Sequence, residues 1–287
     1  MISKDTFFSK KRTLNLGGTL HKLSSPMVMG ILNITPDSFY DGGRYTTDVE
    51  ILSRCERILS EGAAIIDLGA YSSRPGAEDI SEEQELERLL PVLKLIRKEF
   101  PKALVSVDTF RANVAKMAVA DFGVEVINDI SAGELDKNML ETVASLKVPY
   151  VMMHMKGNPQ TMQQQTEYHS LIKDILKYFA ERVDKAKKAG IRDIIIDPGF
   201  GFGKTLEQNY LLLSRLSEFR IFELPILVGL SRKSMIYKLL ETSPDNALTG
   251  TVALQTIALL NGVDILRAHD VKEAIDTIKI VNAFKNS

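Results

Sequence analysis

The hydrophobic pattern of the chain consists of short apolar segments, each followed by a longer stretch in which apolar residues recur with helical spacing. The apolar segments are nearly continuous and do not alternate with polar residues, which is typical of parallel strands buried on both faces. Strands are therefore predicted at Val28–Ile34, Ala64–Gly69, Ala103–Thr109, Val124–Ile130, Pro149–His154, Asp193–Asp197, Pro225–Leu230 and Asp264–His269.

The stretches between these strands carry the start and stop signals of helices. Ser81-Glu-Glu-Gln84 has the form of a capping box, and Gly62 stands where a glycine would end a helix that begins at Asp48. Helices are predicted over residues 48–62, 81–100, 111–122, 136–146, 169–190, 206–219, 233–240, 246–261 and 271–284. The strand–helix pair occurs eight times, which favours an α/β fold of the (β/α)8 TIM-barrel type, with a doubly wound open sheet as the alternative.

The first 25 residues lie outside this alternation and form an N-terminal extension. Within them, Thr13–Leu20 contains the pair Gly17-Gly18, which predicts a small β-hairpin. In a barrel we expect this hairpin to close the bottom. The sequence contains no linker or low-complexity tract, so residues 1–287 are interpreted as one domain.

Composition and charge narrow the class of protein. The chain has 287 residues, of which 45% are hydrophobic and 25% charged, as in ordinary globular domains. Lys plus Arg total 36 and Asp plus Glu 37, so there is no general attraction to nucleic acid or to a membrane, and neither is expected as a partner. Cys55, the one cysteine, is expected as a half-buried core thiol. With no signal peptide apparent, a cytoplasmic protein is expected.

Polar and ionisable residues follow nearly every predicted strand. The active site of a barrel is built at the C-terminal ends of its strands, so these residues would converge on one face. They are Asn33, Asp108, Asn128, His154, Asp197, Ser231, Lys233, Arg267 and His269. Their shared position at strand ends predicts an active site.

Asp108, Asn128 and Asp197 give the strongest signal within this set. They emerge from apolar strands, where an unpaired carboxylate is costly, so a ligand or a cation must satisfy them. Helix capping is the alternative for Asp129, Ser131 and Asp270. His154 is interpreted either as a satisfied core histidine or as a functional residue.

Three common cofactor motifs do not fit. Only three residues separate Gly199 from the pair Gly203-Lys204, whereas a P-loop requires four. Lys204 also occupies the third glycine position of a dinucleotide-binding motif. No spacing of His, Cys and carboxylate residues indicates a built-in zinc site.

Several sequence blocks together resemble the dihydropteroate synthases, a family of pterin-binding TIM-barrel enzymes. The blocks are residues 30–39, 41–43, 73–76, 106–109, 127–129, 197–204, 229–234 and 267–271. They occur in the family's order from about Met27 to the C-terminus. The segment at residues 69–76 departs from the family's usual Gly-Gly-Glu-Ser-Thr-Arg-Pro-Gly. Here Ala70, Tyr71 and Ser73 replace the second Gly, the Glu and the Thr.

The resemblance implies a transferase of folate biosynthesis and target of sulfonamides. It would condense 6-hydroxymethyl-7,8-dihydropterin pyrophosphate with p-aminobenzoate to give 7,8-dihydropteroate and pyrophosphate, with Mg²⁺ as cofactor and as a homodimer. Pterin contacts are expected from Asp108, Asn128, Asp197, Phe202, Lys233 and Arg267, with catalytic roles for Asp108, Asp197, Lys233 and Arg267. The p-aminobenzoate contacts are expected from Phe39, Ser73, Arg74, Pro75 and Ser234. Pyrophosphate contacts are expected from Asn33, Arg267 and His269, with Asn33 also binding Mg²⁺.

Two other functions are compatible with parts of this pattern. A pterin-binding methyltransferase acting on methyltetrahydrofolate would share the pterin contacts, but it would not require the blocks at residues 73–76 and 231–234. A non-catalytic pterin-binding paralogue would be favoured by loss of a loop motif, and the altered residues at 70–73 keep this alternative open.

Overall fold

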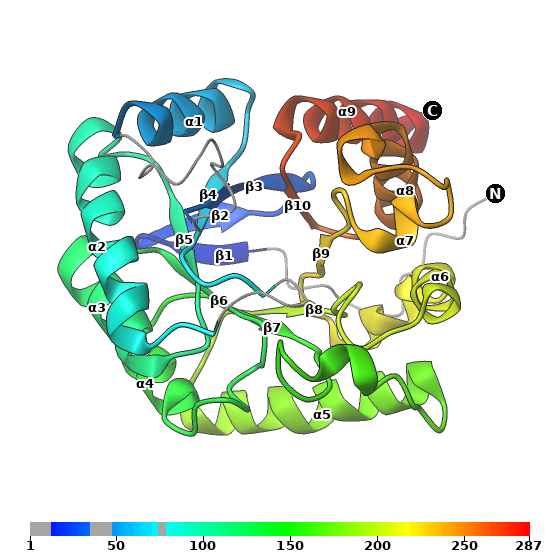
Figure 1. Cartoon of the computed structure of the whole chain (residues 1–287), viewed down its shortest axis with the longest axis horizontal. Coiled ribbons are helices and arrows are strands. Elements are labelled where there is room, and N and C mark those ends of the chain that lie inside the picture. Colours follow the sequence, from blue (N-terminus) through cyan, green and yellow to red (C-terminus); the bar gives the residue numbers. More distant parts are fainter. Residues whose placement is uncertain (1–12, 35–47, 74–78) are drawn as a thin grey trace.

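The computed structural model describes residues 13–34, 48–73 and 79–287. Its central sheet has eight parallel strands in the order β8-β7-β6-β5-β4-β3-β10-β9 (Figure 1). The strands are β3 (Met27–Asn33), β4 (Ile65–Gly69), β5 (Val105–Asp108), β6 (Val126–Asp129), β7 (Tyr150–Met153), β8 (Ile194–Asp197), β9 (Leu227–Gly229) and β10 (Ile265–Ala268). A parallel bridge from Ile196 to Ile226 brings the two edges of the sheet together. The predicted barrel is thus confirmed, and the open-sheet alternative is wrong.

Helices surround the strands (Figure 1). The α-helices are α1 (Asp48–Ser60), α2 (Glu82–Glu99), α3 (Ala112–Phe122), α4 (Met139–Leu146), α5 (Leu171–Ala189), α6 (Leu206–Ser214), α7 (Ser234–Tyr237), α8 (Leu248–Leu260) and α9 (Val271–Asn286). Short 3-10 helices are η2 (Met162–Gln164), η3 (Leu216–Phe222) and η4 (Pro244–Asn246). The predicted capping box is present, since Ser81 Oγ accepts from Gln84 N and Gln84 Oε1 accepts from Ser81 N.

Two predicted helices are shorter than expected. The helix predicted over 206–219 ends at Ser214, and the chain continues as the 3-10 helix η3. The Ser214 hydroxyl donates to the carbonyl of Leu211 at 2.8 Å, and such a local bond competes with a regular helix end. The helix predicted over 233–240 is regular only in α7.

The N-terminal hairpin closes the bottom of the barrel, as predicted. Its strands are β1 (Thr13–Leu16) and β2 (Thr19–Lys22), joined by Gly17 and Gly18, which both have positive φ. Leu14 and Leu16 are fully buried and pack in one cluster with Met29, Ile65, Val126, Val151, Ile195, Leu227 and Ile265. Burying such a leucine stabilises a fold by about 1.5–3 kcal/mol.

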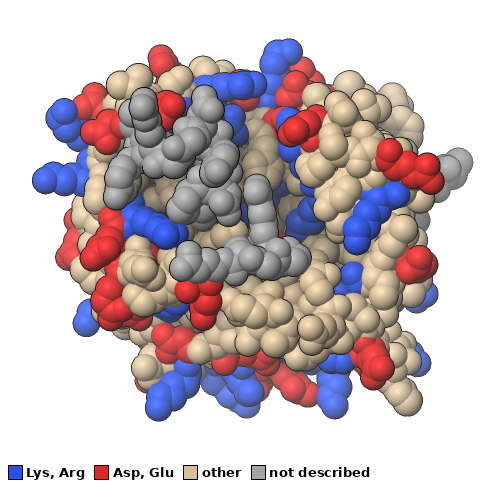
Figure 2. Space-filling model, viewed as in Figure 1, with Lys and Arg blue, Asp and Glu red and all other residues tan. Residues whose placement is uncertain are grey.

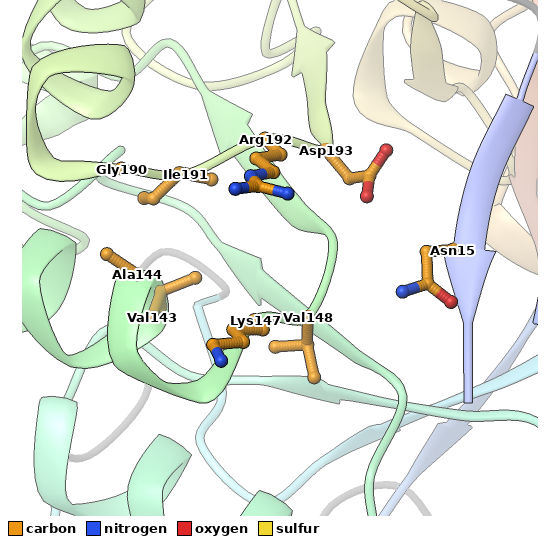
Figure 3. A pocket seen from close by; sticks show the side chains of 9 residues that line it. All are labelled: Asn15, Val143, Ala144, Lys147, Val148, Gly190, Ile191, Arg192 and Asp193. Atoms are coloured by element: carbon orange, nitrogen blue, oxygen red, sulfur yellow. The ribbon is translucent and has the colours of Figure 1, made fainter. Parts of the chain in front are cut away.

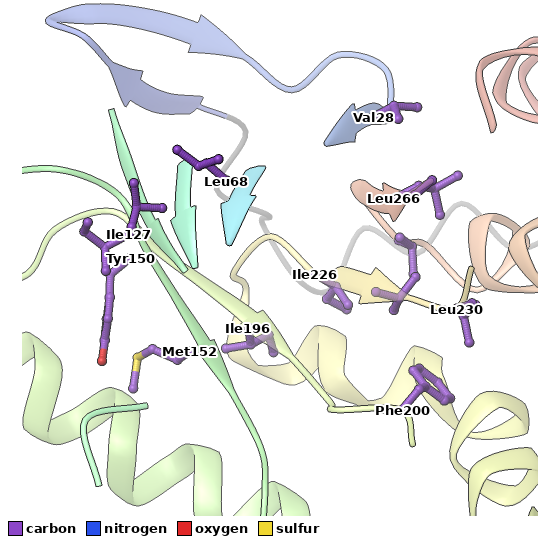
Figure 4. Packing of buried hydrophobic residues seen from close by; sticks show 14 of the residues in the cluster. Val28, Leu68, Ile127, Tyr150, Met152, Ile196, Phe200, Ile226, Leu230 and Leu266 are labelled. Atoms are coloured by element: carbon purple, nitrogen blue, oxygen red, sulfur yellow. The ribbon is translucent and has the colours of Figure 1, made fainter. Parts of the chain in front are cut away.

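A larger hydrophobic cluster lies between the strands and the surrounding helices. Val28, Leu68 and Leu266 are among its strand residues (Figure 4). Cys55 belongs to this cluster and is fully buried, deeper than the half-buried position expected for it. Burial raises the pKa of the Cys55 thiol to about 12, so it is an unreactive core residue. Within the described ranges, no helix is both long and apolar enough to cross a membrane.

Candidate active site

Arg267 lies at the centre of a buried polar cluster inside the barrel. Its Nε lies 2.6 Å from Asp67 Oδ2, and its Nη2 lies 2.7 Å from Asp108 Oδ2. Asn128 Nδ2 donates to the same Asp67 oxygen at 3.2 Å. Strands β10, β4, β5 and β6 supply these four residues, and the parallel register sets Asp108 beside Asn128. The fold therefore unites three predicted site residues.

Asp67 is the member of this cluster that sequence reasoning missed. It sits in the middle of β4 and is completely buried. One carboxylate oxygen is bound by Arg267 and Asn128, whereas Oδ1 has no hydrogen-bond partner among the described residues. A lone acid within an apolar strand was a usable signal, because a buried carboxylate must be paired.

The charges of this cluster depend on one another. Burial raises the pKa of Asp108 to about 7, although Arg267 opposes that shift. Burial alone would lower the pKa of Arg267, but Asp67 and Asp108 raise it above its ordinary value. The guanidinium therefore stays charged, while Asp108 can change protonation near neutral pH.

Asp197 and Lys233 form a second group of charged residues, close enough to shift each other's pKa. Asp197 ends β8, and its Oδ1 accepts from Gly199 N at 2.8 Å. Lys233 donates to the carbonyl of Phe200, and its Nζ lies 4.5 Å from the centre of the Phe202 ring. Burial raises the pKa of Asp197 while Lys233 opposes it, and burial lowers the pKa of Lys233 to about 8 while Asp197 opposes it.

The turn after β8 is held by a buried lysine, which the sequence analysis named only in the cofactor motifs that do not fit and to which it gave no role in the site. Lys204 Nζ lies 3.0 Å from His154 Nδ1, 2.8 Å from the Gly199 carbonyl and 3.0 Å from the Phe202 carbonyl. An ammonium has three donors, and these three acceptors match them. Burial lowers the pKa of Lys204 to about 7. Gly199 is required at this turn, since a Cβ there would fall 1.9 Å from the His154 carbonyl oxygen.

His154, Asp129 and Asp270 have structural partners. His154 is buried against Lys204, so the interpretation as a satisfied core histidine fits the geometry. Asp129 accepts from the Tyr150 hydroxyl and from backbone N–H groups of the turn that follows β6. The Asp270 side chain makes no capping hydrogen bond to α9, against the capping alternative, and instead forms a two-bond pair with Arg232.

Asn33 and His269 lie at strand ends near Arg267. Asn33 ends β3, and a Cβ at Gly69 would lie 3.1 Å from Asn33 Oδ1 and 3.6 Å from Asp108 Cβ. The missing side chain at Gly69 thus leaves room beside both residues. His269 Nδ1 lies 3.2 Å from Ser231 Oγ. Burial and the charge of Arg267 lower the pKa of His269 to about 3, so its ring is neutral.

Comparison with known proteins gives the family of this site. The family described as pterin binding enzyme matches residues 29–269. The chain is 44% identical over 268 residues to the dihydropteroate synthase of Escherichia coli K12, covering 93% of this chain and 94% of that protein. The chain belongs to the dihydropteroate synthases.

Solved dihydropteroate synthases share the fold. A Yersinia pestis dihydropteroate synthase in a sulfonamide drug complex has a TM-score of 0.90 and 43% identity, covering 96% of this chain and 100% of that one. A Thermus thermophilus dihydropteroate synthase in complex with 4-aminobenzoate has a TM-score of 0.85 and 36% identity, covering 95% of this chain and 99% of that one. Membership of the dihydropteroate synthases replaces the methyltransferase alternative.

The residues that the dihydropteroate synthase resemblance assigns to p-aminobenzoate are only partly described. Phe39, Arg74 and Pro75 lie outside the described residues. Ser73 follows β4 and is half-buried, and Ser234 is the first residue of α7, directly after Lys233. Both serines therefore follow strand ends on the same face as the charged clusters.

A pocket at the other end of this dihydropteroate synthase is separate from these clusters. It has a volume of about 250 Å³ and is lined by residues from the hairpin and from the segments that precede β7 and β8 (Figure 3). Asn15, Lys147 and Arg192 are among them.

The surface charges are mixed. On the face of the molecule drawn in Figure 2, acidic and basic side chains are interspersed around the outline, and neither sign forms a continuous patch.

Proposed function

We propose that this protein condenses 6-hydroxymethyl-7,8-dihydropterin pyrophosphate with p-aminobenzoate, forming 7,8-dihydropteroate and releasing pyrophosphate. The observation that carries the proposal is the pairing of Arg267 with Asp67 and Asp108, close enough to Asp197 and Lys233 for the two groups to interact electrostatically. This arrangement places hydrogen-bond acceptors and cations on one face of a barrel whose family binds pterins.

The pterin is recognised by the buried acceptors. Its 2-amino group and ring N–H are both donors, and a carboxylate can accept both in a fork, which suits Asp197. Asp108 and Asn128 provide hydrogen-bond partners for the remaining ring nitrogens, Asp108 as an acceptor and Asn128 as a donor or an acceptor. Lys233 donates to the oxygen and N5 side of the ring, and Phe202, beneath the same ammonium, forms a wall of the pocket. Analogues without these groups would leave buried polar atoms unpaired.

The leaving pyrophosphate is held by Arg267, His269 and Asn33. Arg267 supplies a fixed positive charge, and neutral His269 supplies a ring N–H as a donor. The site also fits Mg²⁺, because Asn33 offers one hard oxygen beside the space left by Gly69, and Mg²⁺ commonly takes few protein ligands. Mg²⁺ bound at Asn33 would neutralise charge on the pyrophosphate.

The reaction is a displacement at the methylene carbon of the pterin. The amine nitrogen of p-aminobenzoate forms the new C–N bond, the C–O bond to pyrophosphate breaks, and the amine loses a proton. An aromatic amine is already nucleophilic, so the protein contributes mainly by positioning and by stabilising the departing charge. Asp67 and Asp108 hold the guanidinium of Arg267 in place before the charge develops.

The activity is tested with purified protein and both substrates. We expect dihydropteroate and pyrophosphate to form in equal amounts with Mg²⁺ present. Chelation by EDTA is expected to abolish turnover, and added Mg²⁺ to restore it. Omitting p-aminobenzoate is the control for simple hydrolysis of the pterin pyrophosphate. Pterin binding without any product would contradict the proposal and favour the non-catalytic paralogue.

We also propose that the enzyme is a homodimer whose interface is formed by α8 and α9. These helices pack together and expose Ile257, Leu260, Ile280 and Phe284 on their outer side. Exposed apolar side chains gathered on adjacent helices are typical of an interaction surface.

The dimer is tested by the double variant Ile257→Glu and Ile280→Glu. Light scattering after size exclusion should give twice the 32.0 kDa chain mass for the wild type and the single mass for the variant. Val49→Glu, at an exposed residue of α1, is the matched control. A wild type that runs as a monomer at micromolar concentration would contradict the interface.

A further inference from the structure

Tyr71 joins loops that follow different strands at the active-site face. It lies two residues after the end of β4, and only 9% of it is exposed. Its hydroxyl donates to Asp79 Oδ1 at 3.0 Å and accepts from Gln160 Nε2 at 2.7 Å. Asp79 lies at the far end of the same loop, and Gln160 lies in the loop after β7. The donor and the acceptor capacity of the hydroxyl are both used.

The Tyr71 ring has contacts of its own, in addition to those of its hydroxyl. Phe110, in the loop after β5, meets it edge-on with ring centres 5.0 Å apart and an interplanar angle of 85°. The guanidinium of Arg111 lies 5.5 Å from the centre of the Tyr71 ring and 5.0 Å from that of Phe110. A cation over an aromatic face is attracted by the ring quadrupole.

Arg111 extends these contacts to the start of α2. It pairs with buried Glu85 and donates to the carbonyls of Ile80 and Ser81. Asp79 and Ile80 are thereby fixed at one end of the loop, and Tyr71 at the other. We call Tyr71, Asp79, Phe110, Arg111 and Gln160 the Tyr71 clamp.

We propose that the Tyr71 clamp positions Ser73 for p-aminobenzoate, so that Tyr71 sets the affinity for the second substrate. The inference rests on the proposed function. Ser73, which the family pattern assigns to p-aminobenzoate, lies two residues from Tyr71, so any shift of Tyr71 moves it. The pterin contacts come from strand residues, Lys233 and Phe202, whereas the hydrogen bonds of the clamp join other loops to one another. The Tyr71 hydroxyl bonds to Asp79 and Gln160, neither of which is assigned to the pterin, so losing these two bonds should affect p-aminobenzoate more than the pterin.

The contacts of the clamp require a tyrosine, rather than a glutamate, at position 71. A glutamate, which the family commonly has in this block, has no ring to pack against Phe110. Its carboxylate would also face Asp79, and like charges at close range repel. Tyrosine provides both the ring contact and the neutral hydroxyl that Asp79 and Gln160 require. Tyr71→Glu is therefore expected to weaken p-aminobenzoate use more than Tyr71→Phe.

The test compares Tyr71→Phe, Gln160→Ala and the double variant with the wild type. Tyr71→Phe keeps the ring and loses both hydrogen bonds, so the KM for p-aminobenzoate should rise about tenfold, as expected for one to two lost hydrogen bonds. The dissociation constant for the pterin should change less than about twofold. Gln160→Ala should raise the same KM by about threefold, and the double variant should equal Tyr71→Phe alone, because the two side chains share one bond.

Tyr178→Phe is the matched control, since its hydroxyl donates to the Ser131 carbonyl away from the clamp. It should lose some stability without altering the KM for p-aminobenzoate. Unchanged KM values in Tyr71→Phe and Gln160→Ala, or an equal loss of pterin affinity, would overturn the clamp. Because Gln160 is exposed, its variant is expected to fold even if a Tyr71 variant does not. Wild-type turnover is measured first, and its absence would refute the proposed function and the clamp together.

Discussion

Replacing Arg267 with methionine is expected to lower kcat/KM by about 10³-fold, because the preorganised cation that meets the leaving pyrophosphate is lost. The same change leaves Asp67 and Asp108 in the barrel interior without their shared cation. Removing one partner of a buried ion pair typically costs about 3–5 kcal/mol, so we expect the free energy of unfolding to fall by that amount. Steady-state kinetics and urea unfolding measure the two effects separately.

Two further variants separate charge from geometry at this position. Arg267→Lys keeps the positive charge but cannot reach Asp67 and Asp108 with two donors at once, so it should recover stability more than activity. Arg57→Met, at an exposed arginine of α1, is the matched control and should leave kcat/KM and stability nearly unchanged. An Arg267→Met enzyme with kcat/KM within about tenfold of the wild type would contradict the assigned role.

The barrel was predictable because its strands are buried on both faces, which gives a continuous apolar pattern. Every predicted strand is found, with ends that differ by at most two residues, and the hairpin closes the bottom as expected. The end of α6 was not predictable from periodicity, because apolar residues continue beyond Ser214 while the backbone tightens into η3. Local side-chain hydrogen bonds, rather than hydrophobic pattern, decide such boundaries.

The candidate site was predictable where its residues stand at strand ends, as Asp108, Asn128 and Asp197 do. Asp67 was missed because its partner Arg267 is 200 residues away in the sequence, and no local pattern links them. Tyr71 and Gln160 are likewise 89 residues apart. A lone acid in an apolar strand signals that Asp67 needs a partner, but the identity of that partner becomes visible only when the closed barrel brings distant strands and loops together. The substrate roles of the individual site residues remain predictions that the proposed variants test.

Replacing Lys233 with methionine is expected to lower kcat/KM by about 10²-fold, because a donor to the pterin is lost and the pKa of Asp197, already raised by burial, rises further without the neighbouring cation. The effect should appear chiefly as weaker pterin binding, which equilibrium titration with the pterin alone would show. Lys188→Met, at an exposed lysine of α5, is the matched control. Unchanged pterin affinity in Lys233→Met would contradict the assignment.

The pH profile of kcat/KM should reflect the titration of one residue from each charged cluster, Lys233 and Asp108. Lys233 donates as an ammonium, and its pKa of about 8 means that activity falls as the pH rises above that value and the proton is lost. Asp108 accepts as a carboxylate, and its pKa of about 7 means that activity falls as the pH drops below that value and the group is protonated. Because kcat/KM reports the free enzyme, the profile should be bell-shaped with its maximum between these values.

Lys233→Arg keeps a cation that does not titrate in this range, so it should remove the alkaline decline while leaving the acid decline in place. Asp108→Asn should do the reverse, abolishing the acid limb at a lower overall rate. If both limbs survived in both variants, the titrating groups would lie elsewhere, and the pairing of Arg267 with Asp108 and the electrostatic interaction of Lys233 with Asp197 would be structural. If each variant removes one limb, the charges that the barrel buries at its strand ends are the ones that bind and orient the pterin.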